Sequence, residues 1–276
     1  MDEAPARHPR AEAESGPARH FDEGDAYERF MGRWSRAAGE IFLDWIAPPR
    51  AARWLEIGCG SGIFTELIIE RCAPAAVCAV DTSEKLIEHA RRRPLARFAE
   101  FRIADAEALP FTDRAFDVVA SSLLMNFVTD RPRAMAAMRR VTRPGGLVAA
   151  MVWDFAADLS PSGPMRRTLR KMGLEAPPVP GSRESTLDAL ADLFRGAGFD
   201  AIAATAIDVT ASFPSFDDFV RAQTTSYNPL TKFIDRLGAA ERAKFYRQVG
   251  AAISTSPDGR IKYSARANVI KARVQG

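Results

Sequence analysis

The stretch that decides the fold is WLEIGCGSGIFTELI, residues Trp54 to Ile68. A short strand pattern runs directly into glycines at 58, 60 and 62, and a helical pattern follows at once. A glycine-rich turn between a strand and a helix lets a ligand approach the backbone, and the first N–H groups of the helix are free to bind an anion. The stretch therefore predicts a ligand site at the end of a buried strand.

Strand and helix patterns alternate on both sides of this turn. The expected strands are apolar and cover residues 52–57, 75–80, 99–104, 116–122, 147–153, 200–213 and 259–274. The expected helices cover residues 27–47, 63–72, 83–92, 130–141 and 186–198, with a further helical region at 216–253. Strands this apolar are buried on both faces, which is typical of parallel sheets. We predict an α/β fold with a doubly wound, mostly parallel seven-stranded sheet and a helical lid.

The chain divides into three parts by composition. Residues 1–25 are rich in Pro, Ala and charge and predict a disordered leader. Residues 26–50 predict an N-terminal helical cover, which Pro48 and Pro49 end. Residues 51–276 predict the core, with the lid inserted at about 216–253.

Charge and cysteine usage exclude several classes of protein. The formal net charge is +3 with 38 basic and 35 acidic residues, so we expect neither nucleic acid nor an anionic membrane as partner. The arginine clusters at 91–93, 139–140 and 166–167 fit solvated helix faces. Three cysteines without metal-ligand spacing indicate reduced thiols, no metal and a cytoplasmic location, and no apolar run approaches membrane-spanning length.

The acidic residues after the next two strands narrow the ligand. The dinucleotide pattern G-x-G-x-x-G fails because Ile63 stands at its third glycine, which counts against an NAD-linked oxidoreductase. Asp81 ends the second strand, where a carboxylate can accept hydrogen bonds from both ribose hydroxyls. Asp105 follows the third strand, where it can accept the exocyclic amine of adenine. A nucleoside lying across the strand ends fits both positions.

Four motifs carry a family resemblance. LEIGCGSG, VDTSEKLIEHAR, ADAEALPFTDRAFDVV and MRRVTRPGGLV resemble the successive motifs of class I S-adenosylmethionine-dependent methyltransferases, closest to the branch with the ubiquinone and menaquinone biosynthesis enzymes. The resemblance implies S-adenosylmethionine as cofactor and a small organic molecule as methyl acceptor. It covers residues 51–153 well and becomes loose from Phe155 onward.

The resemblance also implies roles for single residues. Glu56, Gly58, Cys59, Gly60 and Gly62 would hold the methionine part of the cofactor, and Glu56 would bind its amino group. The ribose and adenine would lie against Asp81, Thr82, Leu86, Asp105 and Ala106. Ser121 and Ser122 would lie near the transferring methyl group.

The sequence gives weaker evidence for the residues that bind or activate the methyl acceptor. Two of the three histidines lie in the leader and His89 lies on an expected helix, so no histidine base is expected. The remaining candidates are Tyr27 and Asp154 for catalysis and Arg33, Asn126 and Trp153 for substrate binding, each with packing or capping as the competing interpretation. Methylation of RNA or protein, and cofactor binding without catalysis, stay open as alternatives. We expect a monomer or a homodimer.

Overall fold

The computed structural model describes residues 28–225, 228–253 and 256–275. Its sheet has seven strands in the order β3-β2-β1-β4-β5-β7-β6. The first five strands run parallel, and β7 pairs antiparallel with both β5 and β6. The strands are β1 (Arg53–Ile57), β2 (Ala76–Asp81), β3 (Glu100–Ile103), β4 (Phe116–Ser122), β5 (Thr142–Trp153), β6 (Phe199–Phe213) and β7 (Ile261–Val274). The predicted fold class is confirmed.

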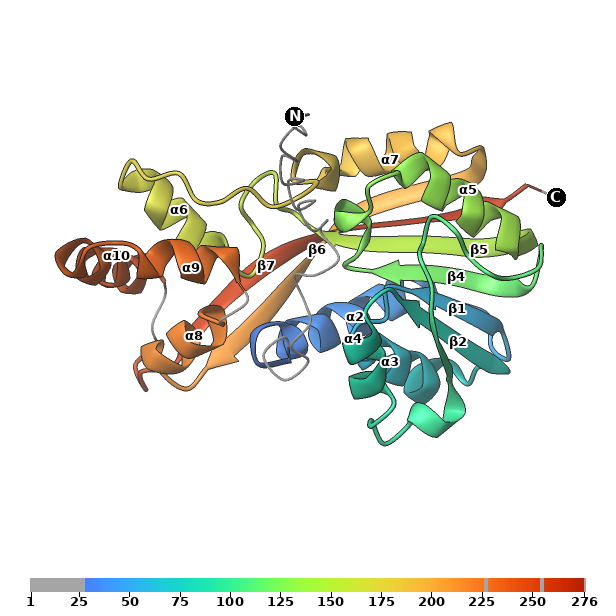
Figure 1. The fold of residues 1–276 in the computed structure, drawn as a ribbon, viewed down its shortest axis with the longest axis horizontal. Helices are drawn as coiled ribbons and strands as arrows, with labels where there is room; N and C mark the ends of the chain where they lie inside the picture. The colour runs from blue at the N-terminus through green and yellow to red at the C-terminus, as the bar shows by residue number, and fades with distance from the viewer. Residues whose placement is uncertain (1–27, 226–227, 254–255, 276) are drawn as a thin grey trace, which may run out of the picture.

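Helices cover both faces of the sheet (Figure 1). One face packs against α2 (Arg33–Ile46), α3 (Ile63–Cys72) and α4 (Glu84–Ala90), and the other against α5 (Arg131–Val141) and α7 (Leu187–Gly196). Neighbouring strand residues serve opposite faces: Trp54 joins the first cluster of buried side chains and Leu55 joins the second. This alternation places apolar side chains on both faces of β1, as the sequence predicts for a buried parallel strand.

Local signals set the ends of several helices. The Ser83 hydroxyl accepts the Leu86 N–H at the start of α4, and the Asp130 carboxylate accepts the Arg133 N–H at the start of α5, as N-cap residues do. Ahead of Pro48, α2 ends at Ile46. The fifth strand was expected from residue 147 but begins at Thr142, because Thr142 pairs with Phe116 before the register shifts.

The last two strands extend past the rest of the sheet and carry a group of helices at their far ends (Figure 1). These are α6 (Gly163–Lys171), α8 (Phe216–Gln223), α9 (Pro229–Asp235) and α10 (Ala239–Ala252). Phe219 on α8 and Phe245 on α10 are fully buried and belong to the same core cluster as Trp34 and Trp54. The helices of the 216–253 region therefore share the main hydrophobic core.

The shorter elements are η2 (Glu28–Gly32), η3 (Ala96–Phe98), η4 (Met125–Phe127) and η5 (Arg183–Ser185). Cys59, Cys72 and Cys78 are buried free thiols. None of the helices in the described ranges is long and apolar enough to span a membrane.

Candidate functional site

The turn after β1 is held by the strand next to it. The N–H groups of Gly58 and Cys59 both donate to the carbonyl of Val80 on β2. Gly58 has φ +74° and Gly60 has φ +52°, so both lie in the left-handed region that favours glycine. A Cβ on Gly58 would meet the Leu124 side chain at 2.6 Å, whereas a Cβ on Gly60 would have no atom within 4 Å. Gly60 thus faces open space at the strand end.

Asp81, the last residue of β2, braces this turn. One carboxylate oxygen accepts the Gly60 N–H at 2.9 Å and the other accepts the Ser83 N–H at 2.9 Å. Burial raises the pKa of Asp81, and the hydrogen bonds from backbone N–H groups oppose that rise. The Asp81 carboxylate therefore adds a side-chain link to the backbone hydrogen bonds that join the two strand ends.

Glu56 is the last residue but one of β1 and is fully buried. The Thr65 hydroxyl on α3 donates to its carboxylate. Burial raises the pKa of Glu56 to about 8; the Thr65 hydrogen bond and Arg93 oppose the rise, and Asp81 adds to it. Burial therefore favours the neutral form of this carboxyl, and a cation close to it would favour the ionised form.

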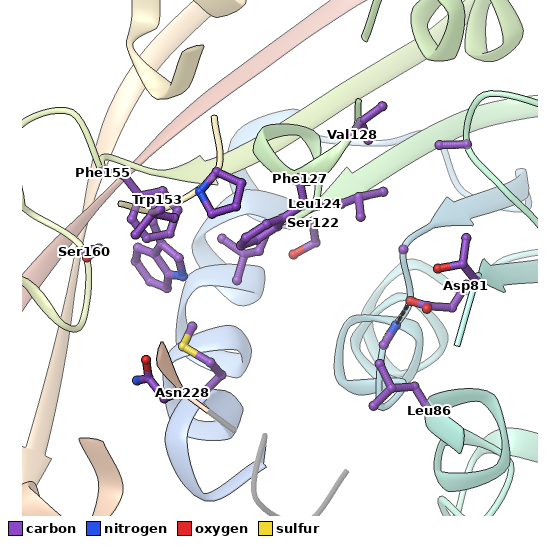
Figure 2. Close-up of a pocket in the computed structure, with 18 of the residues that line it drawn as sticks. Asp81, Leu86, Ser122, Leu124, Phe127, Val128, Trp153, Phe155, Ser160 and Asn228 are labelled. Atoms are coloured by element: carbon purple, nitrogen blue, oxygen red, sulfur yellow. Dashed lines mark hydrogen bonds between the residues drawn. The ribbon is translucent and has the colours of Figure 1, made fainter. Parts of the chain in front are cut away.

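A cavity of about 570 Å³ opens beside the turn and continues across the carboxyl ends of the strands. Asp81, Asp105 and Glu107 line one part of it, which we call the acidic end. Trp153, Phe155, Ser160, Arg166 and Asn228 line the other part, which we call the arginine end. Figure 2 shows Asp81 and Leu86 on one side of this space and Trp153, Phe155, Ser160 and Asn228 on the other.

The arginine end comes from segments far apart in the sequence. Trp153 ends β5, Ser160 lies in the loop before α6, and Arg166 lies on α6. The Arg166 Nε donates to the buried Asp158 carboxylate at 3.2 Å, and its Nη1 donates to the Pro177 carbonyl at 2.9 Å. Residues 228–230 at the start of α9 complete the wall. Loops after β5 and the helices at the far ends of β6 and β7 therefore build this end.

Nine residues expected from the sequence line the cavity. Near the glycine turn and the acidic end these are Gly58, Gly60, Asp81, Thr82, Leu86, Asp105 and Ala106, and farther along they are Ser122 and Trp153. Asp105 also accepts the Glu107 N–H at 2.9 Å, so its carboxylate shapes the turn that it occupies.

Other expected residues do not line the cavity. Glu56, Cys59 and Ser121 are buried behind it, and Gly62 packs against Ala90. The Arg33 guanidinium is exposed, donates to the Ser212 carbonyl and lies 4.5 Å from the Phe213 ring centroid. Tyr27 lies outside the described residues.

Two further candidates have local structural contacts. The Asn126 amide donates to the Pro180 carbonyl at 3.2 Å, so it anchors the proline-rich segment that lines the cavity. The Asp154 carboxylate accepts the Ala157 N–H at 3.0 Å, so Asp154 caps the turn that follows β5, as the competing interpretation predicts.

Several lining residues were missed from the sequence. Phe30, Met31, Phe127, Phe155, Ser160, Arg166 and Asn228 belong to this group. The sequence holds a weak indication that Arg166 is partly buried. On α6 it flanks the buried stripe of Met165, Thr168 and Leu169, whereas Arg167 and Arg170 are exposed. Helical spacing alone does not show what that stripe packs against.

Comparison with known proteins shows what the central part of the chain is similar to. Residues 55–150 match the methyltransferase domain family. A malonyl-[acyl-carrier protein] O-methyltransferase from Erwinia pyrifoliae is 40% identical over 113 residues, 41% of this chain and 42% of that enzyme. A ubiquinone/menaquinone biosynthesis C-methyltransferase, UbiE, from Dinoroseobacter shibae is 34% identical over 129 residues, 45% of this chain and 51% of that enzyme. The chain therefore spans about half the length of these two relatives or less.

Two proteins match over most of the chain. A trans-aconitate 2-methyltransferase from Variovorax paradoxus is 29% identical over 247 residues, 85% of this chain and 91% of the relative. A solved structure from Thermotoga maritima, described as an S-adenosylmethionine-dependent methyltransferase and possible histamine N-methyltransferase, superposes with a TM-score of 0.54 at 19% identity. That structure aligns over 94% of this chain and 100% of its own, which supports the fold.

Proposed function

We propose that this chain is a class I S-adenosylmethionine-dependent methyltransferase that methylates a small organic molecule held at the arginine end of the cavity. The observation that carries the proposal is the continuity of one cavity from the glycine turn and Asp81 to the chamber beside Trp153. The cofactor supplies a methyl group on a positively charged sulfur when it is bound. The protein's part is to align acceptor and methyl group and to exclude water, which contributes on the order of 7–11 kcal/mol in favourable cases.

The residues at the acidic end fit the cofactor. Gly60 offers an open approach to its backbone, because a side chain there would project into free space. Asp81 would accept hydrogen bonds from the ribose hydroxyls, and Asp105 with the backbone of Ala106 would contact the adenine. Thr82 and Leu86 line the same part of the cavity and would flank the nucleoside. Glu56 would approach the amino group from behind the turn.

The size of the cavity, about 570 Å³, supports a small acceptor. The proline-rich segment 177–180 and residues 228–230 line the same cavity as Trp153. A relative that matches 85% of this chain is named for methylation of trans-aconitate, a small organic acid. RNA or protein as acceptor, and cofactor binding without catalysis, are the alternatives. Cytoplasmic location, a monomeric or homodimeric state and the absence of nucleic-acid binding stay predictions.

Calorimetry tests the proposal. We expect saturable binding of S-adenosylmethionine and S-adenosylhomocysteine and none of NAD or NADP. Transfer of an isotopically labelled methyl group from the cofactor to a small molecule would exclude the non-catalytic alternative. Saturable binding of NAD with no response to S-adenosylmethionine would overturn the proposal.

A further inference from the structure

We propose that the methyl acceptor is a carboxylic acid, which Arg166 binds through its carboxylate and which is methylated on oxygen. This inference rests on the proposed function and names the substrate class for the same cavity. Three observations at the arginine end support it: the positive charge of Arg166, the hydrogen-bond donors without a partner, and the absence of a base among the described lining residues.

Charge is divided unequally between the two ends of the cavity. Asp81, Asp105 and Glu107 all lie at the carboxyl ends of β2 and β3, where the nucleoside is expected. Arg166 is the one basic side chain lining the cavity within the described ranges, and no lining carboxylate lies beside it at the arginine end. The buried Asp158 next to Arg166 also pairs with Arg170, so two guanidinium groups share a single carboxylate. This local excess of positive charge favours an anionic acceptor.

Hydrogen-bond donors remain unused at the same end. Among residues 28–225, 228–253 and 256–275, the Nη2 of Arg166 has no partner. Trp153 is 3% exposed, and its Nε1 also has no partner in the described part of the chain. Figure 2 shows the indole beside the space between Asp81 and Ser160. A buried N–H without a partner is costly, so a small shift of the Trp153 side chain that brings its Nε1 to a ligand oxygen would be favourable.

No described residue at the arginine end can remove a proton at neutral pH. The polar side chains lining this part are Ser160, Ser162, Arg166 and Asn228. The Asp154 carboxylate accepts the Ala157 N–H and lies outside the lining. A carboxylate with an ordinary pKa near 4 is already ionised at neutral pH, so it needs no base among the described residues.

The transfer step then needs no proton acceptor. One carboxylate oxygen is held by Arg166, and the other forms a bond to the methyl carbon. The methyl–sulfur bond breaks as this bond forms, and its electron pair stays on sulfur. The anionic acid and the cationic sulfonium become a neutral methyl ester and a neutral thioether, and no proton is gained or lost.

The other residues that line the arginine end are mostly apolar, and they indicate what the remainder of the acceptor molecule is like. Phe127, Phe155 and Leu230 line the chamber together with the four residues Pro177 to Pro180. An acid with an aromatic or aliphatic body suits these walls better than a highly polar one. Cinnamate, benzoate and octanoate are therefore suitable probes, with cinnamamide as a neutral analogue of nearly the same shape.

Calorimetry of the full chain loaded with S-adenosylhomocysteine tests binding. We expect cinnamate to bind and cinnamamide to bind at least about 10-fold more weakly. Arg166→Met should weaken cinnamate roughly 10- to 150-fold, and Arg166→Lys should recover part of that loss. Arg170→Met is the matched control, because Arg170 pairs with the same Asp158 but does not line the cavity. Trp153→Phe leaves the Asp158 pairs intact, and we expect it to weaken cinnamate about 3- to 10-fold.

The product tests the chemistry. With methyl-labelled cofactor and the acid probes, we expect a product that releases labelled methanol in alkali, as an ester does. An alkali-stable methylated product overturns carboxylate methylation while leaving the proposed function intact. Equal affinity for cinnamate and cinnamamide, no binding of any acid probe, or preference for phenyl phosphate over benzoate overturns the carboxylate assignment. Failure to bind S-adenosylmethionine contradicts the proposed function itself.

Discussion

The Asp81 carboxylate accepts the backbone N–H of Gly60 at 2.9 Å, which ties the end of β2 to the turn after β1. Its other oxygen accepts the Ser83 N–H, so the residue expected to bind ribose also shapes the turn beside it. Asp81→Ala should weaken S-adenosylmethionine binding roughly 10- to 150-fold, because hydrogen bonds to a charged group are worth roughly 1.5–3 kcal/mol. Calorimetry measures the affinity, and a lowered melting temperature should accompany the loss.

The control for this variant is Asp113→Ala. Asp113 is exposed, pairs with Arg140 and does not line the cavity, so its loss should leave cofactor affinity unchanged. Asp81→Ala with parental melting and parental affinity would show that the ribose lies elsewhere.

Glu56 should make stability depend on pH. Its pKa is about 8 in the folded chain and 4.5 as the ordinary value, so the folded state holds a proton between these values that the unfolded state has released. Stability should therefore fall as pH rises from about 4.5 to about 8 and then level off, by roughly 4–5 kcal/mol in total from this group. Denaturant unfolding at pH 5, 7 and 9 measures the slope.

Glu56→Gln should remove that part of the slope while keeping an oxygen for the Thr65 hydroxyl. Parallel stability curves for parent and variant between pH 5 and pH 9 would show that Glu56 is ionised in the folded state across this range.

The two glycines of the turn should respond differently to alanine. Gly58→Ala adds a Cβ that would overlap the Leu124 side chain, in addition to the cost of a positive φ, and should cost about 2–4 kcal/mol of stability. Gly60→Ala has the conformational cost alone, about 1 kcal/mol, and places a methyl group in open space beside the turn. We expect Gly60→Ala to impair cofactor affinity more than stability. Equal melting temperatures for the two variants would contradict this difference.

Arg93 should matter far more than its neighbours in the arginine cluster. It donates to the Ser61 carbonyl in the glycine turn and pairs with Glu66 and Glu28. Its removal leaves the largely buried Glu66 carboxylate without this cation, so Arg93→Met should cost about 2–4 kcal/mol of stability. Phe30 and Met31 follow Glu28 and line the cavity, so cofactor affinity should fall as well. The matched control is the exposed Arg92→Met, and an equal effect of both variants would contradict this role.

The sequence was sufficient to predict the sheet, because its signals are local. Strands β1, β2 and β4 are short and largely apolar runs, and the turn at Gly58 and Gly60 marks a strand end without any knowledge of the rest of the chain. The acidic end was predictable for the same reason, since Asp81 and Asp105 directly follow their strands.

The arginine end could not be predicted in this way, because tertiary packing brings its parts together. Arg166 was expected on a solvated face like Arg167, but its side chain is largely covered and lines the cavity. The helices at 216–253 were expected as a lid inserted into the core, and Phe219 and Phe245 on these helices are buried in the main core cluster. Replacing that whole segment should therefore expose the far ends of β6 and β7 and lower stability as well as methyl transfer.

The most direct test of the account is a crystal structure of the protein with S-adenosylhomocysteine. We expect the ribose hydroxyls within hydrogen-bond distance of Asp81, the adenine beside Asp105 and Ala106, and the sulfur facing the chamber that Trp153 and Arg166 line. A cofactor bound outside this cavity, or one whose sulfur faces away from that chamber, would contradict the account.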